Sequence, residues 1–198
     1  SRTHADAAAS PTDHGTSTSH ISVVDADGNA VAMTTSIEAS FGARIVAAGF
    51  VLNNQLTDFA FAPEIGGRPV NNRPGPGKRP RSSMAPTLVF DQDGSLKLVL
   101  GSPGGPRIIG YVAQTLIGVL DWRLDVQSAI DLPRVVNRNG PTELEPAPGS
   151  ESLRQALEQR GHSVQIRELE SGLHGIQRDG PVLMGGADPR REGAIRAD

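Results

Sequence analysis

Residues 18–36 read TSHISVVDADGNAVAMTTS, two runs of β-forming residues on either side of a turn at 25–29. The turn is rich in Asp, Gly and Asn, which tolerate the positive φ angles of a tight connection between strands. This stretch predicts an antiparallel β-hairpin. A second hairpin is predicted over 87–100, around the turn Asp91-Gln92-Asp93-Gly94.

A helix is predicted directly after the second hairpin. Between 107 and 120 the apolar residues recur at three- and four-residue steps, which gives a helix one packed face, and Pro106 suits its first turn. Strands, then helices, then strands indicate an α+β fold with mainly antiparallel sheets. The later elements are expected to be helices at 126–131 and 151–160, a strand at 164–169 and a hairpin at 175–184.

The composition excludes several classes of protein. The 198 residues carry a net charge of −3, with 4% aromatic residues and no basic run, which argues against a nucleic-acid surface. Cysteine is absent, which excludes disulfides, thiolate metal sites and cysteine nucleophiles. No apolar run approaches the roughly 18 residues of a membrane helix. We expect one domain over 18–198, without a membrane span, and a linker arm over 1–17.

Candidate chemistry is concentrated in five polar clusters at strand ends or in loops. Taken singly, each cluster is also typical of a solvated linker or turn. The segment after the second hairpin has neither the phosphate-loop nor the dinucleotide-binding glycine pattern, and the five histidines lack metal-ligand spacing, so no metal or cofactor is expected. The clusters are Thr18-Ser19-His20, Ser36 with Glu38, Asn53-Asn54-Gln55 with Asp58, Arg79-Pro80-Arg81-Ser82-Ser83, and Gly104-Gly105.

Together, the clusters resemble the small subunit of the gamma-glutamyltranspeptidases, a family of N-terminal-nucleophile hydrolases. The resemblance covers nearly everything from residue 18 to the end. It implies a four-layer αββα sandwich with mainly antiparallel sheets, completed by a large subunit cut from the same precursor. The motifs, in the family's order, are TSHISVVDADGNAV (18–31), LNNQLTDF (52–59), KRPRSSMAPT (78–87), GSPGGPRII (101–109) and GGADPR (185–190).

The resemblance assigns the nucleophile to Thr18. In this family a precursor cuts itself before a threonine, here between Ser17 and Thr18, with Thr16 as the rival position. The freed α-amine can act as general base, because its reference pKa of about 7.7–8.0 leaves a neutral fraction near neutral pH. Residues 1–17 would then be the end of the large subunit.

Further catalytic roles follow from the same resemblance. Ser36 stands where a threonine is usual and would help activate the Thr18 hydroxyl. The backbone N–H groups of Gly104 and Gly105 would form the oxyanion hole for the tetrahedral intermediate.

The resemblance also implies a site for the α-ammonium and α-carboxylate of a γ-glutamyl group. Glu38, Gln55 and Asp58 would accept hydrogen bonds from the ammonium. Ser82 and Ser83 would donate to the carboxylate, whereas Arg79 and Arg81 are interpreted as structural or rim residues.

The expected activity is γ-glutamyl transfer or hydrolysis of glutathione-like compounds through an acyl-Thr18 ester, as in a gamma-glutamyltransferase or glutathione hydrolase. The segment between Asp58 and Ser82 is shorter than in members with a tyrosine-bearing lid and contains no tyrosine, so transfer and hydrolysis both stay open. One alternative is a glutaryl-cephalosporin acylase-like enzyme, whose substrate lacks the α-ammonium. Another is an unprocessed, non-catalytic homologue. The family implies a periplasmic or secreted location.

Overall fold

The computed structural model describes residues 18–197. The expected linker arm, with Ser17 and the rival cut site Thr16, lies outside the described residues. The strands are β1 (Thr18–Val24), β2 (Ala30–Ser36), β3 (Val46–Ala47), β4 (Phe50–Val51), β5 (Glu64–Ile65), β6 (Arg68–Pro69), β7 (Thr87–Phe90), β8 (Leu96–Gly101), β9 (Val135–Asn137), β10 (Thr142–Leu144), β11 (Val164–Ile166), β12 (His174–Asp179) and β13 (Val182–Ala187). The helices are α1 (Ile108–Leu120), α2 (Val126–Asp131) and α3 (Ser150–Glu158), with 3₁₀ turns η1 (Gln55–Asp58) and η2 (Gly105–Arg107).

The predicted first hairpin is confirmed as β1 and β2. Its turn is closed by the Asp25 carboxylate, which accepts the N–H groups of Asp27 and Asn29 at 3.0 and 2.8 Å. The antiparallel register pairs Thr18 with Ser36 at the open end of the hairpin. Turn chemistry at one end thus determines which side chain stands beside Thr18 at the other.

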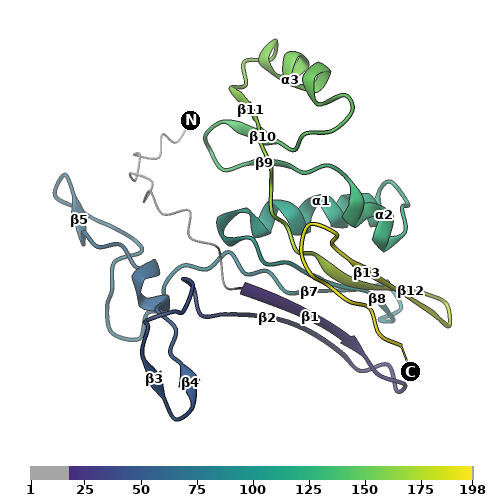
Figure 1. Ribbon diagram of the computed structural model, residues 1–198, viewed down its shortest axis with the longest axis horizontal. Coiled ribbons are helices and arrows are strands. Elements are labelled where there is room, and N and C mark those ends of the chain that lie inside the picture. Colours follow the sequence, from purple (N-terminus) through teal and green to yellow (C-terminus); the bar gives the residue numbers. More distant parts are fainter. Residues whose placement is uncertain (1–17, 198) are drawn as a thin grey trace.

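The central part of the described residues forms three layers, and the sheet β11-β10-β9 with α3 lies beyond α1 (Figure 1). The β1–β2 hairpin packs on one face of a four-stranded antiparallel sheet with the order β13-β12-β8-β7. Helices α1 and α2 pack on the opposite face of that sheet. This β, β, α order supplies three layers of the expected αββα sandwich, and no helix within 18–197 covers the outer face of the hairpin.

Strand β8 lies at the centre of these layers because its alternating side chains serve both faces. Leu98 and Leu100 are fully buried in the cluster formed with α1 and α2. On the other face, a Cβ at Gly101 would lie 2.2 Å from the His20 ring, so only glycine lets the hairpin approach here.

Several elements differ from the expectations. The strand expected at 164–169 ends at Ile166, and it pairs in parallel with β10, an exception to the antiparallel pattern. Strands β9 and β10 were not expected, because each has only three residues and lies close to prolines. The two-residue hairpins β3–β4 and β5–β6 were not expected either, and they project from the body of the molecule (Figure 1).

Candidate active site

Thr18 and Ser36 form the centre of the candidate site. The Thr18 hydroxyl donates a 2.9 Å hydrogen bond to Ser36 Oγ, which also accepts the Glu38 backbone N–H at 2.9 Å. Thr18 is buried against the layers below, with 9% of its surface exposed. Ser36 therefore orients the threonine hydroxyl and is itself fixed by the backbone that follows β2.

A second polar network lies beneath Thr18. His20 is buried between the hairpin and the four-stranded sheet; its Nδ1 is 2.8 Å from Thr34 Oγ1 and its Nε2 is 3.1 Å from Ser22 Oγ. The Ser22 hydroxyl in turn donates to the His174 carbonyl on β12. Burial, followed by the nearby His174, lowers the pKa of His20 to about 4. His20 is thus neutral at physiological pH and links the hairpin to the sheet.

Two carboxylates and an amide gather beside Ser36. Glu38 adopts a left-handed φ of +72°, uncommon for a residue other than glycine, and accepts a 3.1 Å hydrogen bond from Gln55 Nε2. Burial and then the neighbouring Asp58 carboxylate raise the pKa of Glu38, and burial raises that of Asp58. Gln55 Oε1 is buried without a hydrogen-bond partner. The arrangement presents one buried acceptor without a partner beside two neighbouring carboxylates, which suits a cationic ligand.

Asn54 joins the two chain segments that carry these groups. Its backbone N–H donates to the Ile37 carbonyl at 3.2 Å, and its side-chain oxygen accepts the Ala39 N–H at 3.0 Å. Both contacts flank Glu38, so the Asn-Asn-Gln sequence has a structural role as well as supplying Gln55.

Ser82 and Ser83 follow Arg81 in the extended segment before β7, with Ser82 exposed and Ser83 half-buried. Ser82 Oγ accepts the Met84 N–H at 3.2 Å in the extended segment before β7. The positive charge of Arg81 acts on both Glu38 and Asp58, in each case opposing the upward shift of the carboxyl pKa. Arg81 is interpreted from the sequence as a structural or rim residue, and its exposed side chain lies near enough to the two acids for its charge to act on both.

Gly104 and Gly105 lie in the loop after β8. Their φ angles of +136° and +57° favour glycine, and a Cβ on Gly104 would come within 2.6 Å of the Tyr111 ring. Pro103 of this loop lines a cavity of about 610 Å³ together with Thr18 and the C-terminal segment 190–194. The loop therefore borders the space beside Thr18, and the oxyanion-hole role of its N–H groups stays a prediction.

The described residues show neither a metal centre nor a membrane-spanning helix. Among residues 18–197, no group of three or more histidine or acidic side chains is arranged to hold a metal ion. In the same residues, no helix is long and apolar enough to cross a membrane.

A threonine at the start of a strand, hydrogen-bonded to a second hydroxyl on stacked antiparallel sheets, is the arrangement of N-terminal-nucleophile hydrolases. The family model described as Gamma-glutamyltranspeptidase matches residues 1–197. The chain belongs to the gamma-glutamyltranspeptidase family.

Individual relatives agree with this family. The chain is 42% identical over 185 residues to the glutathione hydrolase proenzyme of Escherichia coli K12, covering 87% of this chain and 31% of that protein. The solved gamma-glutamyltranspeptidase from Pseudomonas nitroreducens complexed with L-DON has a TM-score of 0.78 and 32% identity, covering 90% of this chain and 98% of that one. A cephalosporin acylase from Bacillus halodurans also has a TM-score of 0.78, with 28% identity, covering 89% and 33%. The chain thus spans about a third of the length of the curated relative.

Some contacts of the site were not foreseen from the sequence. The burial of His20 between the hairpin and the sheet depends on Gly101, 81 residues further on. The approach of Arg81 to Glu38 and Asp58 likewise joins segments separated by more than twenty residues. Local sequence pattern holds no signal for either contact.

Proposed function

We propose that this chain is the small-subunit region of an enzyme that transfers or hydrolyses γ-glutamyl groups through an acyl ester on Thr18. The observation that carries the proposal is the 2.9 Å hydrogen bond from the Thr18 hydroxyl to Ser36, which also accepts the backbone N–H of Glu38, a member of the acidic cluster with Gln55 and Asp58. The proposed nucleophile, Thr18, therefore lies close to acidic side chains that can bind a cationic group. The identity with the E. coli glutathione hydrolase proenzyme supports the same reading.

The chemistry begins with a cut between Ser17 and Thr18, which frees the α-amine of Thr18. That amine takes the hydroxyl proton while Thr18 Oγ1 attacks the γ-carbonyl carbon, and the N–H groups of Gly104 and Gly105 stabilise the oxyanion. The proton then passes to the leaving amine as the C–N bond breaks. Water or an acceptor amine attacks the ester, which releases the acyl group and restores the hydroxyl.

The substrate class follows from the charges around Ser36. Glu38, Gln55 and Asp58 would hold the α-ammonium, and Ser82 and Ser83 would donate to the α-carboxylate. A nearby cation favours ionised carboxylates, so bound ammonium would reverse the upward pKa shifts of Glu38 and Asp58. Glutathione-like γ-glutamyl compounds carry both groups.

The partner we propose is the large subunit of the same precursor, which would supply the outer helical layer. The outward face of the β1–β2 hairpin is apolar and exposed: Ile21, Val23, Val31 and Met33 each keep close to half of their surface accessible. An apolar face of this kind marks an interaction surface. Residues 18–198 expressed alone should be poorly soluble, and a soluble, cooperatively folding monomer would contradict this. By family, we place the enzyme in the periplasm or outside the cell, which fractionation with the native leader would test.

The test is intact mass and N-terminal sequencing of the protein expressed with its upstream region, before and after incubation with a γ-glutamyl anilide. We expect a chain that begins at Thr18 and gains a glutamyl adduct. Thr18→Ala should abolish both, whereas Thr16→Ala, the matched control, should keep both. An intact junction without an adduct would favour the unprocessed, non-catalytic homologue.

The second candidate is an acylase acting on glutaryl compounds, favoured by the structural likeness to the B. halodurans cephalosporin acylase. A glutaryl group lacks the ammonium that Glu38, Gln55 and Asp58 would bind. Faster turnover of glutaryl anilide than of γ-glutamyl anilide would support the acylase reading.

A further inference from the structure

Residues 60–80, here called the neck loop, separate the two halves of the proposed glutamyl site. Glu38, Gln55 and Asp58 precede this loop, and Ser82 and Ser83 follow it. The α-ammonium and α-carboxylate of a glutamyl group are attached to one carbon, so the two halves must be held at a fixed spacing. A side chain hydrogen-bonded to both ends of the neck loop would set that spacing.

Asn72 makes these connections. Its Nδ2 donates to the Asp58 carbonyl at 2.6 Å, and its Oδ1 accepts the Arg81 backbone N–H at 3.1 Å. Its own carbonyl accepts the Ala60 N–H at 3.0 Å. One amide therefore donates to the segment before the loop and accepts from the segment after it, which matches the two functions of an asparagine side chain.

The contact with Asp58 also satisfies a group that would otherwise lack a partner within its helix. Asp58 ends the 3₁₀ turn η1, and the last carbonyl groups of such a turn accept no hydrogen bond from N–H groups within the turn. The rest of the neck loop is supported separately: Lys78 Nζ donates to the carbonyls of Asn71 and Arg73 at 2.7 and 2.9 Å. Asn72 is thus available to link the ends of the loop while other contacts maintain its shape.

We propose that Asn72 is a positioning residue that fixes Asp58 relative to Ser82 and Ser83, and so sets the affinity for the α-centre of the γ-glutamyl donor. This inference rests on the proposed function. Asn72 touches neither Thr18 nor Ser36 in its recorded hydrogen bonds, so its removal should weaken substrate binding more than it slows the chemical steps.

The experiment measures kcat and KM for γ-glutamyl-p-nitroanilide with the processed full-length protein. Asn72→Ala should raise KM about tenfold and change kcat less than threefold. Asn72→Asp keeps the acceptor for Arg81 but turns an oxygen toward the Asp58 carbonyl, so its KM should rise at least as much. Asn71→Ala is the matched control, because it alters the exposed neighbour and keeps the backbone carbonyl that Lys78 contacts.

The outcomes separate this inference from the proposed function. A wild-type protein that does not turn over the anilide would refute the proposed function itself. An active wild type with unchanged KM in both Asn72 variants would overturn the inference alone, as would a fall in kcat at constant KM. If both variants fail to produce a chain beginning at Thr18, Asn72 supports folding rather than substrate binding, and the inference is again overturned.

Discussion

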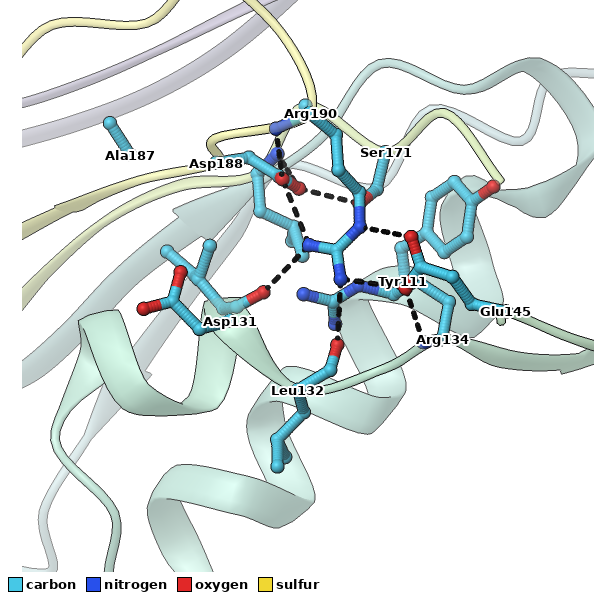
Figure 2. A network of polar contacts seen from close by, with 12 residues as sticks. Tyr111, Asp131, Leu132, Arg134, Glu145, Ser171, Ala187, Asp188 and Arg190 are labelled. Carbon is cyan, nitrogen blue, oxygen red and sulfur yellow. Dashed lines mark hydrogen bonds and ion pairs between the residues drawn. The ribbon is translucent and has the colours of Figure 1, made fainter. Parts of the chain in front are cut away.

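Two polar clusters of this molecule differ in whether their charged side chains have partners of opposite charge. In the Arg190 network, Figure 2 shows one guanidinium surrounded by acceptors: Nε and Nη2 donate to the two oxygens of Glu145, each at 2.6 Å, and Nη1 donates to Asp188 at 3.0 Å. In the candidate site, Glu38 and Asp58 face one another, and Gln55 Oε1 has no partner.

The difference distinguishes a cluster that stabilises the fold from a cluster suited to binding a ligand. In the Arg190 network, burial opposes the charged forms, yet hydrogen bonds leave the pKa of Arg190 raised and that of Asp188 lowered. The pKa shifts of Glu38 and Asp58 have the opposite sense, since both carboxyls are held toward the neutral form. The Arg190 guanidinium is compensated by the carboxylates around it, as expected of a group that stabilises the fold, whereas Glu38 and Asp58 lie beside one another, as expected of a cluster that binds a cationic ligand.

The largest effect should come from breaking the Arg190 network. Arg190→Met would leave the buried carboxylates of Glu145 and Asp188 without their main cation, which typically costs about 3–5 kcal/mol. We expect loss of soluble protein or a much lower denaturation midpoint in the full-length protein. Arg160→Met, at an exposed arginine, is the control. Near-normal stability of the Arg190 variant would mean that this network does not support the fold.

The pH dependence of stability tests whether the polar network around His20, beneath Thr18, stabilises the fold. The folded pKa of His20, about 4, lies below the ordinary value of 6.5, so the unfolded chain takes up the proton first as pH falls. Stability should therefore be complete above pH 6.5 and decline between 6.5 and 4, by at most about 1.4 kcal/mol per pH unit. Urea unfolding across this range should show a shallower slope for His20→Gln than for the exposed control His162→Gln. Equal slopes would contradict a buried neutral His20.

Substitution in the pair Glu38 and Asp58 should affect substrate binding rather than stability, the reverse of substitution at Arg190. Asp58→Asn would remove the negative charge that raises the pKa of Glu38 while keeping a side chain that can hydrogen-bond to Glu38, so stability should stay the same or rise. KM for a γ-glutamyl anilide should increase at least tenfold, because the α-ammonium loses a charged acceptor. Glu64→Gln, at an exposed acid in β5, is the control for unchanged kinetics. Marked destabilisation by Asp58→Asn would place the pair among the structural networks.

The contrast also explains what the sequence could predict. The three predicted hairpins and all three helices follow from local patterns of apolar and turn residues, and the register that pairs Thr18 with Ser36 follows from one turn. The expected site residues Glu38, Gln55 and Asp58 came from a family resemblance, and the structure brings them together. The motif GGADPR at 185–190 was recognised, but its role in the Arg190 network was not, because Glu145 lies 45 residues away.

The contacts that escaped prediction share one physical property. Gly101 against His20 and Asn72 between Asp58 and Arg81 depend on how sheets and loops pack, and neither adjacent residues nor periodicity encode that packing. The same holds for β9 and β10, which are too short to show alternation and are strands only because they pair with one another and with β11.

The smallest effect is expected at Arg134, which sharpens the comparison within a single network. This arginine is fully buried beside Arg190 (Figure 2), but all three guanidinium nitrogens lack hydrogen-bond partners, and burial lowers its pKa to about 10. Its backbone N–H, which donates to Glu145, would survive substitution.

Arg134→Met replaces a buried charge that makes no side-chain hydrogen bond with an apolar chain of similar length. Removing its desolvation cost should offset the lost attraction to Glu145 and Asp188, so the change in unfolding free energy should stay within about 1 kcal/mol, of either sign. Denaturant unfolding of Arg134→Met beside Arg190→Met measures this directly. A loss at Arg134 as large as that at Arg190 would mean that proximity to the carboxylates, rather than hydrogen bonding to them, stabilises the network.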